Sequence, residues 1–217
     1  MTKRKAAMAR APSSVRPAMQ QRSREKRDRL IRAGIATFAR IGYEQARVAD
    51  IAKEAGISVG VFYQRFKDKR GFFDALETEF VRRGKENWDT FFAQADPGWS
   101  AAEFLERLMA ALGRTISRNM GFFRGLITLA HHDKSVVSPA VALDMYGADK
   151  LEAYLVQRKW VTRSKLREQQ VYFALASAMK TMLVMAANDV GPFRATDQAT
   201  SRELALMMGA YLGIRMK

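Results

Sequence analysis

The sequence predicts an all-α protein, with a small basic N-terminal domain (residues 23–67) followed by a larger helical domain (residues 68–217). Apolar residues recur at helical spacing along most of the chain, and no stretch shows the sustained alternation typical of a β-strand. The net charge of +15 is concentrated near the N-terminus, where residues 1–70 hold 18 Lys or Arg against 6 Asp or Glu. In this basic part Gly56 and Gly60 interrupt the helical stretch "DIAKEAGISVGVFYQRFKDK", although a glycine costs a helix interior about 1 kcal/mol.

Charge and composition narrow the partners and the compartment. A basic domain favours a polyanionic partner, either nucleic acid or an anionic membrane surface, over a merely soluble surface. The chain has no cysteine, which excludes disulfides and fits a cytoplasmic location, and it has no run of 18 apolar residues, so no membrane span is expected. Residues 1–22 carry six basic residues, no acidic residue and two prolines. We therefore expect a disordered basic arm there, with an organelle transit peptide as the minor alternative.

Caps and breaks in the apolar pattern predict where the helices lie. The first helix begins near Ser23 and ends at Gly42, where a glycine with positive φ is expected. Two short helices are predicted over 48–55 and 59–66, and a longer one begins after Asp68, its expected N-cap. Further long helices are predicted at about 100–119, 121–132, 139–160, 165–189 and 197–214.

The two glycines are explained if residues 48–66 form two helices joined by a tight turn. Gly56 then supplies the left-handed turn conformation, and Ser58 caps the second helix through its hydroxyl. Such a helix-turn-helix inserts the N-terminal end of its second helix into the DNA major groove. Gly60 would let that helix approach the duplex closely, and Tyr63 would offer its hydroxyl to a phosphate. A generic helical hairpin is the alternative, but this combination in the most basic part of the chain favours DNA.

The segment "GYEQARVADIAKEAGISVGVFYQRFKDKRGFFDAL", with "RDRLIRAGIATFARI" before it, resembles the TetR family of transcriptional repressors. The resemblance covers about residues 24–80. It implies a homodimer with a three-helix DNA-binding domain and a helical domain that binds an inducer and dimerises. Carried onto this sequence, it places base-facing positions at Val59, Gly60 and Val61, positions beside the duplex at Gln64 and Arg65, and phosphate-binding positions at Tyr63 and Lys69.

The family usually has Thr or Ser at the position of Arg47, where it caps the second helix together with an acidic residue three positions later. Arg47 departs from this pattern. Asp50 is present, but a guanidinium cannot accept the capping hydrogen bond. Either Arg47 contacts phosphate or the cap moves. Val59 and Val61 offer no hydrogen bonds, which favours thymine methyl groups as their targets. Together with Arg47 and the capping Ser58, the residues at family positions form the predicted DNA-binding set.

The C-terminal part is expected to supply dimerisation and effector binding. Residues 167–190 are apolar on most of the helix circumference, so this helix must be buried on several sides. The resemblance implies that the last two long helices pair with their symmetry mates, and that the domain binds a small lipophilic or aromatic effector. Aromatic and methionine residues at helical spacing belong to either the core or a pocket. The pocket candidates are Phe104, Leu108, Met109, Leu112, Phe123, Leu126, Met145, Tyr146, Tyr172 and Met179.

No catalytic site, metal site or cofactor is expected. His131 and His132 precede Asp133, but adjacent helical residues point about 100° apart and no further ligand follows at helical spacing. A polar contact to a ligand or an interaction with a helix C-terminus is the better interpretation of these histidines. Two functions therefore remain. One is a ligand-responsive dimeric repressor that binds double-stranded DNA, and the other is a DNA-binding protein without an effector, controlled by a protein partner.

Overall fold

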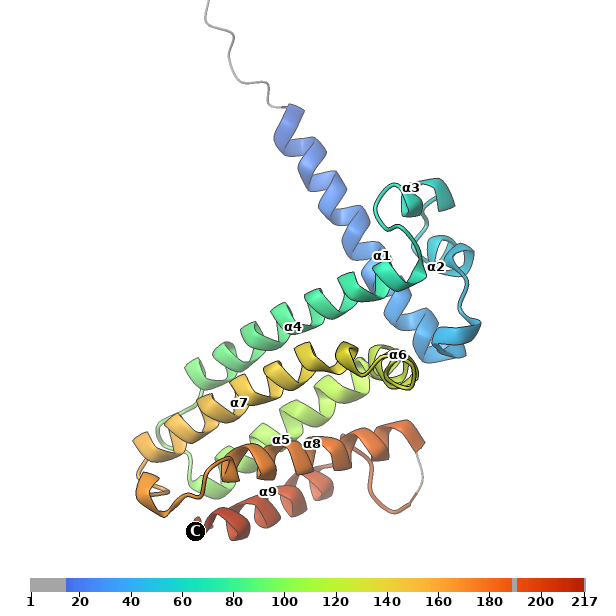
Figure 1. Ribbon diagram of the computed structural model, residues 1–217. Helices are drawn as coiled ribbons and strands as arrows, with labels where there is room; N and C mark the ends of the chain where they lie inside the picture. Colours follow the sequence, from blue (N-terminus) through green and yellow to red (C-terminus); the bar gives the residue numbers. More distant parts are fainter. Residues whose placement is uncertain (1–14, 189–190, 217) are drawn as a thin grey trace, which may run out of the picture.

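The computed structural model describes residues 15–188 and 191–216, with the backbone alone for residues 15–19. All regular structure in these residues is helical, as the sequence predicts (Figure 1). Two short 3-10 helices span Lys134–Val137 and Arg163–Lys165. The α-helices are α1 (Val15–Gln45), α2 (Val48–Glu54), α3 (Val59–Tyr63), α4 (Lys69–Ala93), α5 (Ala101–Arg118), α6 (Met120–Ala130), α7 (Ser138–Gln157), α8 (Gln170–Asn188) and α9 (Gln198–Leu212).

Helix α1 is longer than the sequence predicts. It begins at Val15, whereas the basic arm was expected to extend to residue 22, and residues 1–14 lie outside the described residues. The residues after Pro17 are mostly Ala, Gln, Arg, Glu and Lys, which favour helix, and proline itself is tolerated in a first helical turn. Near the other end, Gly42 takes the expected positive φ, 79°, and the chain kinks there.

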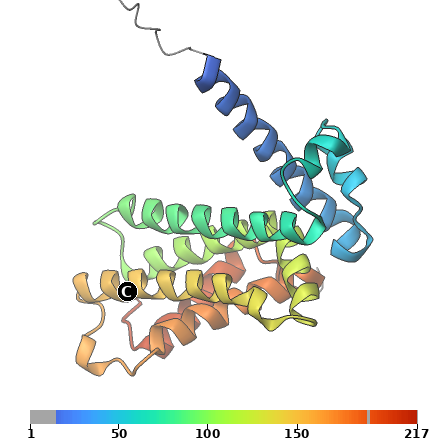
Figure 2. The same ribbon diagram turned by 45° about the horizontal axis from the view of Figure 1, so that its top comes forward.

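Helices α1 to α3 pack around an aromatic core that the first turns of α4 complete. Phe38 of α1, Phe62 of α3 and Phe72 of α4 are fully buried, and the ring centres of Phe62 and Phe72 are 5.2 Å apart. Asp68 caps α4 as predicted, because its carboxylate accepts a hydrogen bond from the Gly71 N–H at 2.7 Å. This core holds α2 and α3 at one end of the molecule, next to α1 (Figure 2).

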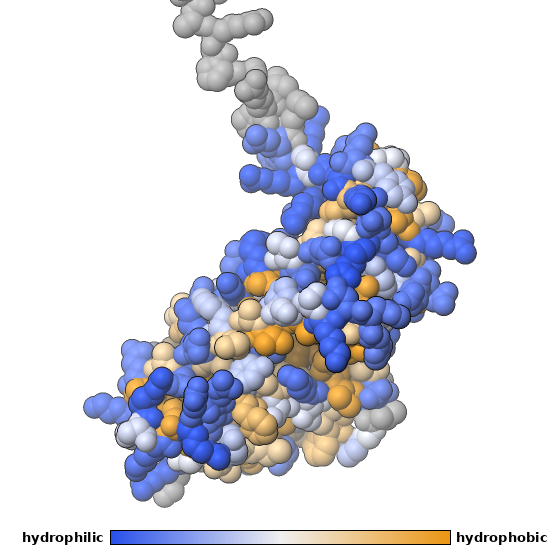
Figure 3. All heavy atoms as spheres, viewed as in Figure 1, coloured by the Kyte–Doolittle hydropathy of each residue, from blue (hydrophilic) through white to orange (hydrophobic). Residues whose placement is uncertain are grey.

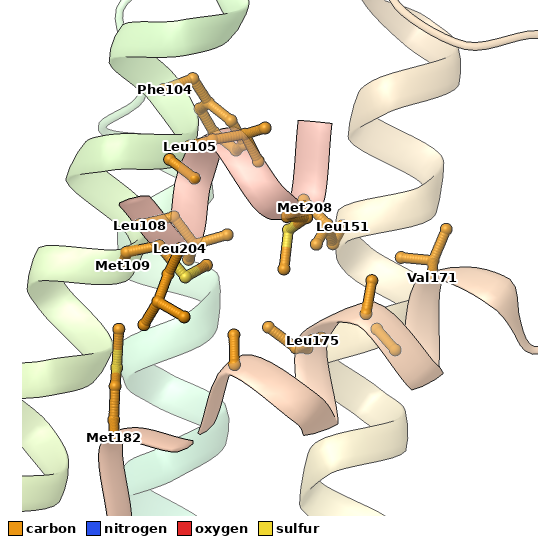
Figure 4. Packing of buried hydrophobic residues seen from close by; sticks show 14 of the residues in the cluster. Phe104, Leu105, Leu108, Met109, Leu151, Val171, Leu175, Met182, Leu204 and Met208 are labelled. Atoms are coloured by element: carbon orange, nitrogen blue, oxygen red, sulfur yellow. The ribbon is translucent and has the colours of Figure 1, made fainter. Parts of the chain in front are cut away.

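Helices α5, α7, α8 and α9 build the core of the C-terminal domain. Leu108, Leu151, Leu175 and Met208, one from each of these helices, are buried in the same cluster and lie close together in Figure 4. Among the described helices, α8 alone is long and apolar enough to cross a membrane by length and composition. It packs here against α5, α7 and α9, which identifies it as a core helix.

Helix α6 joins the two domains. Gly121 lies so close to α1 that a Cβ at this position would stand 2.0 Å from the carbonyl oxygen of Ile35. From the next turn of α6, the Arg124 guanidinium donates to the carbonyl oxygen of Ala39 in α1 at 2.8 Å and to that of Ala187 in α8 at 3.4 Å. A movement of the C-terminal helices can therefore reach the N-terminal domain through α6.

Candidate nucleic-acid interface and neighbouring cavity

Helices α2 and α3 meet at the tight turn that the sequence predicts. Gly56 has a φ of 61°, and the Ile57 N–H donates to the Ala52 carbonyl oxygen at 2.9 Å, which closes the turn after α2. Ser58 caps α3, since its hydroxyl accepts a hydrogen bond from the Val61 N–H at 3.3 Å. The predicted conformation of the glycine and the predicted cap are both confirmed, and the two helices form a helix-turn-helix.

One face of α3 is open to solvent and carries the residues predicted to meet DNA. Val59 is 41% exposed and Tyr63 is 53% exposed, while Gly60 and Gln64 are also exposed and Val61 is half-buried. Packing within the protein does not require the glycine, because a Cβ at Gly60 would have its nearest neighbour 4.0 Å away. Since a helix disfavours glycine, its presence fits a surface that another molecule approaches closely.

Arg47 stands at the N-cap position of α2 with an exposed side chain. Its guanidinium has no acceptor and cannot cap the helix. The Asp50 carboxylate instead accepts a hydrogen bond from the backbone N–H of Arg47 at 3.1 Å. The helix still begins at Val48, so the cap has not moved, and the Arg47 guanidinium is left exposed at the start of α2.

Lys69 has a structural role that the sequence does not indicate. Its ammonium donates to the carbonyl oxygens of Tyr43 at 2.8 Å, Glu44 at 3.1 Å and Ala46 at 3.0 Å, beyond the kink in α1. These bonds use all three donors of the ammonium. A direct contact between the ammonium and a phosphate would have to replace one of them. The other donors at this position are the backbone N–H groups of the first turn of α4, where the helix dipole favours an anion, although the Asp68 carboxylate already accepts from that of Gly71.

Arg65 lies beyond the end of α3, because that helix ends at Tyr63 instead of continuing to Phe66 as predicted. The Arg65 guanidinium is half-buried and donates to the hydroxyl of Ser23 in α1 at 3.0 Å. Its Nε is buried and has no hydrogen-bond partner among the described residues. Arg65 therefore links α1 to the end of α3. This intramolecular hydrogen bond uses the guanidinium that was expected to lie beside the duplex.

A cavity of about 930 Å³ lies between the helices of the N-terminal domain and those of the C-terminal core. Its wall is formed by α1, α4, α5, α6, α7 and α8, and most of the lining is apolar, including Ile35 of α1, Trp88 of α4 and Phe122 of α6. Hydrophobic residues surround a hollow near α6 and α7 on the face seen in Figure 3. A cavity of this size and lining suits a small apolar ligand.

The N-terminal domain is similar to known DNA-binding proteins. Residues 30–76 match the family model described as bacterial regulatory proteins, tetR family. An HTH-type transcriptional regulator of Mycobacterium tuberculosis is 39% identical over 69 residues, which are 32% of this chain and 35% of that protein. The match thus spans about a third of the length of this curated relative.

Two solved structures extend the likeness to most of the fold. The fatty acid degradation regulator FadR from Bacillus halodurans superposes with a TM-score of 0.62 at 19% identity, over 87% of this chain and 99% of that one. The ketosteroid transcriptional regulator KstR2 of Mycobacterium tuberculosis gives 0.57 at 22% identity, over 88% and 95% of the two chains. Residues 30–76 thus carry the DNA-binding domain of the TetR family, and the chain as a whole shares the fold of these two regulators.

Five residues predicted to bind an effector line the cavity. They are Leu108 and Leu112 of α5, Phe123 and Leu126 of α6, and Met179 of α8. These residues come from three helices that enclose one space, so the apolar faces of these helices border the cavity as well as the core. Their binding role stays a prediction.

The other five candidates do not line this cavity, and their binding role likewise stays a prediction. Phe104 and Met109 are fully buried in the C-terminal core, as Figure 4 shows. Tyr172 packs against the same core. Met145 is 50% exposed on α7, and Tyr146 donates a hydrogen bond from its hydroxyl to an aspartate of α4 at 2.7 Å. Helical spacing identifies an apolar face but not the element that covers it, so core, pocket and surface residues could not be separated.

A buried carboxylate in the cavity wall, Glu79 of α4, was missed by sequence reasoning. It is 5% exposed and pairs with Arg82 and Arg83 of its own helix at 2.7 and 2.6 Å, and with Arg27 of α1 at 3.5 Å. The hydrogen bonds from Arg82 and Arg83 lower the pKa of Glu79 to about 2, against the opposing effect of burial. The spacing of three and four residues was a signal for these two pairs, but nothing local indicated the bond to α1.

Further polar residues line the cavity, and Asp144 and His131 are two of them. Asp144 of α7 is half-buried there, and burial raises its pKa to about 6 although Lys180 of α8 acts in the opposite direction. His131, which follows α6, also lines the cavity, in keeping with a polar contact to a ligand. Within residues 15–188 and 191–216, no group of three His, Asp or Glu side chains is placed to hold a metal ion.

Proposed function

We propose that the protein is a ligand-responsive repressor of transcription in the cytoplasm. It binds a palindromic operator as a homodimer and releases the DNA when a small lipophilic or aromatic molecule enters the cavity. The observation that carries this proposal is that the cavity and the helix-turn-helix domain share two helices. Ile31 of α1 and Leu76 of α4 belong to the core of the N-terminal domain and also line the cavity. A molecule that displaces these helices would move the DNA-binding domain with them.

The exposed face of α3 is the proposed reading surface. Val59 and Val61 would present methyl groups to thymine, and the Gln64 amide matches the edge of adenine. Gly60 lets the helix approach the groove, and the Tyr63 hydroxyl would donate to a phosphate, which positions the domain without reading sequence. In a two-fold dimer the two α3 helices must lie about 34 Å apart, one duplex turn, or a multiple of it.

Helices α8 and α9 provide the proposed dimer surface. Phe173 and Val184 of α8 are each 60% exposed and Met207 of α9 is 66% exposed, although both helices contribute to the core. Tyr211 of α9 is 40% exposed, and its ring centre lies 5.7 Å from that of Phe173. Exposed apolar residues gathered in this way are typical of protein–protein contacts. Pairing with a second copy would bury the rest of the apolar circumference of α8.

The lining of the cavity supports a lipophilic effector. Aromatic rings and aliphatic side chains form most of the wall, and Met179 is of a type that adapts its shape to varied apolar ligands. One structural relative is named as a regulator of fatty acid degradation and the other as a ketosteroid regulator, and both names refer to lipophilic molecules. These names support the class of effector, and they do not identify the molecule.

Selection of bound DNA from a random pool tests the DNA-binding half of the proposal. The expected product is a palindromic sequence with half-sites about one duplex turn apart, bound by a dimer. A protein that enriches no sequence would contradict it. The effector half is tested by a screen of lipophilic and aromatic compounds for loss of operator binding. A screen in which no compound changes operator affinity would favour the second candidate, a DNA-binding protein controlled by a protein partner.

A further inference from the structure

We propose that the N-terminal part of α1 is a second DNA-binding element, which contacts the duplex that flanks the half-site under α3. The element is formed by Arg22, Lys26 and Arg29, which we call the α1 basic stripe. This inference rests on the proposed operator binding and extends it to base pairs that α3 does not read.

The contact between Ser23 and Arg65 fixes the base of this element beside α3. Arg65 follows the last residues of α3, and its guanidinium donates to the Ser23 hydroxyl at 3.0 Å. From this anchor, residues 15–22 continue as a helix that projects away from the body of the protein (Figures 1 and 2). At 1.5 Å per residue this projection is about 12 Å long. A duplex seated on α3 therefore passes close to the base of the projecting helix.

The α1 basic stripe is exposed, and its charges are not used inside the protein. Spacings of four and three residues place Arg22, Lys26 and Arg29 on one face of α1. All three side chains are exposed, and none forms a hydrogen bond or ion pair with another described residue. The neighbouring acids Glu25 and Asp28 form no ion pair with them among the described residues. Glu25 lies on the same face and partly offsets the charge, but the three cations, within about two helical turns and without an ion pair, are available to the phosphates of a duplex.

The direction of the stripe also fits DNA. The backbone at Ile35 and Ala39 marks the side of α1 that packs on α6, and Arg27 marks the side that meets Glu79 of α4. At 100° per residue, Arg29 lies about 120° around the helix from Ile35, and Lys26 about 140° from Ala39. The stripe therefore points away from the C-terminal domain. In helix-turn-helix complexes the helix before the reading helix, which is α2 here, crosses the DNA backbone. Helix α1 packs directly against α2, so its basic face lies next to the element that meets the phosphates.

A pair of matched variants tests the inference. The stripe variant is Arg22→Gln/Lys26→Gln/Arg29→Gln, and the control is Arg114→Gln/Lys159→Gln/Lys165→Gln, which removes the same charge from exposed positions of the C-terminal domain. Both must keep the helix content and melting temperature of the wild type. Binding is measured against salt on the selected operator, once as a minimal duplex and once with about ten further base pairs on each side, one helical turn.

On the long duplex we expect the stripe variant to bind at least about ten-fold more weakly than the wild type at 0.1 M salt. The slope of log affinity against log salt should fall by about 0.9 for each phosphate that the variant no longer neutralises. On the minimal duplex the stripe variant should bind with the affinity of the wild type. The control variant should bind both duplexes with the affinity of the wild type.

Three results would overturn the inference. The first is a stripe variant that binds the long duplex with wild-type affinity. The second is a stripe variant that loses the same affinity on both duplexes. The third is a control variant that loses as much affinity as the stripe variant, which would reflect bulk charge alone. Failure of the proposed function is distinguishable, because the wild type would then enrich no operator. In that case the two variants are compared on a duplex of arbitrary sequence. A reduced salt slope of the stripe variant alone would still support a DNA-binding role of α1, and equal slopes would end it.

Discussion

Replacing Gly121 by alanine tests the joint between α6 and α1. The new Cβ would stand 2.0 Å from the carbonyl oxygen of Ile35 and 2.6 Å from the backbone nitrogen of Ala39. These are backbone atoms of a helix and cannot rotate away, so α1 and α6 would have to separate by about 1 Å or more to restore ordinary contact. Overpacking of this kind costs about 1–3 kcal/mol, and the better helix propensity of alanine offsets up to about 1 kcal/mol of it.

Thermal unfolding of the purified protein measures the effect of Gly121→Ala. Because both clashes are with backbone atoms, we expect a cost at the upper end, about 3 kcal/mol, or about 2–3 kcal/mol after the offset. In a chain of this length 1 kcal/mol corresponds to about 2–4 °C in melting temperature, so we expect a fall of about 4–12 °C. The matched control is Gly71→Ala in the first turn of α4, where a Cβ would meet its nearest neighbour at an ordinary 3.5 Å. This control should melt at the wild-type temperature or slightly above it. A Gly121→Ala protein that melts like the wild type would refute the close backbone packing of α1 on α6.

Three other substitutions separate docking, ion pairing and burial. Gly60→Leu should lower operator affinity at least about ten-fold without lowering the melting temperature, because no protein atom crowds this position; unchanged affinity would remove α3 from the groove. Glu79→Gln should be less stable than the wild type at pH 7. The difference in stability should shrink as the pH falls from 4.5 towards 2, because the pKa of Glu79 in the folded state is about 2 against an ordinary 4.5. A difference in stability that does not depend on pH would exclude the ion pairs as its cause. Asp144→Asn should behave oppositely, because a pKa raised from 3.8 to about 6 destabilises the folded state above pH 6 and not below pH 3.8. In denaturant unfolding the variant should be more stable than the wild type at pH 8 and equally stable at pH 3. Higher stability at both pH values would exclude ionisation of Asp144 as its cause.

Local signals explain why the helix order and the helix-turn-helix could be predicted. The positive φ of Gly56, the hydroxyl cap of Ser58 and the carboxylate cap of Asp68 each depend on residues within three or four positions, so the sequence itself carries them. Even the missing cap at Arg47 was foreseen, because a guanidinium cannot accept a hydrogen bond.

Contacts between distant segments explain what could not be predicted. The three carbonyl oxygens that hold Lys69 lie more than 20 positions earlier, and the hydroxyl that holds Arg65 lies 42 positions earlier. The early start of α1 at Val15 likewise has no break in the pattern to mark it. In the C-terminal domain, Leu112 and Met109 lie on adjacent parts of one stripe, but only the packing of α5 decides that the first faces the cavity and the second the core.

The most direct measurement of the central claim is a titration of one lipophilic compound from the screen into the protein, with and without operator DNA. If the cavity and the helix-turn-helix are coupled through α1, α4 and α6, operator must weaken ligand binding by the same factor by which the ligand weakens operator binding. We predict a common factor of about 5 to 150 in the two dissociation constants. Equal ligand affinities with and without operator would contradict the account, because a ligand that does not distinguish the two states cannot release the DNA.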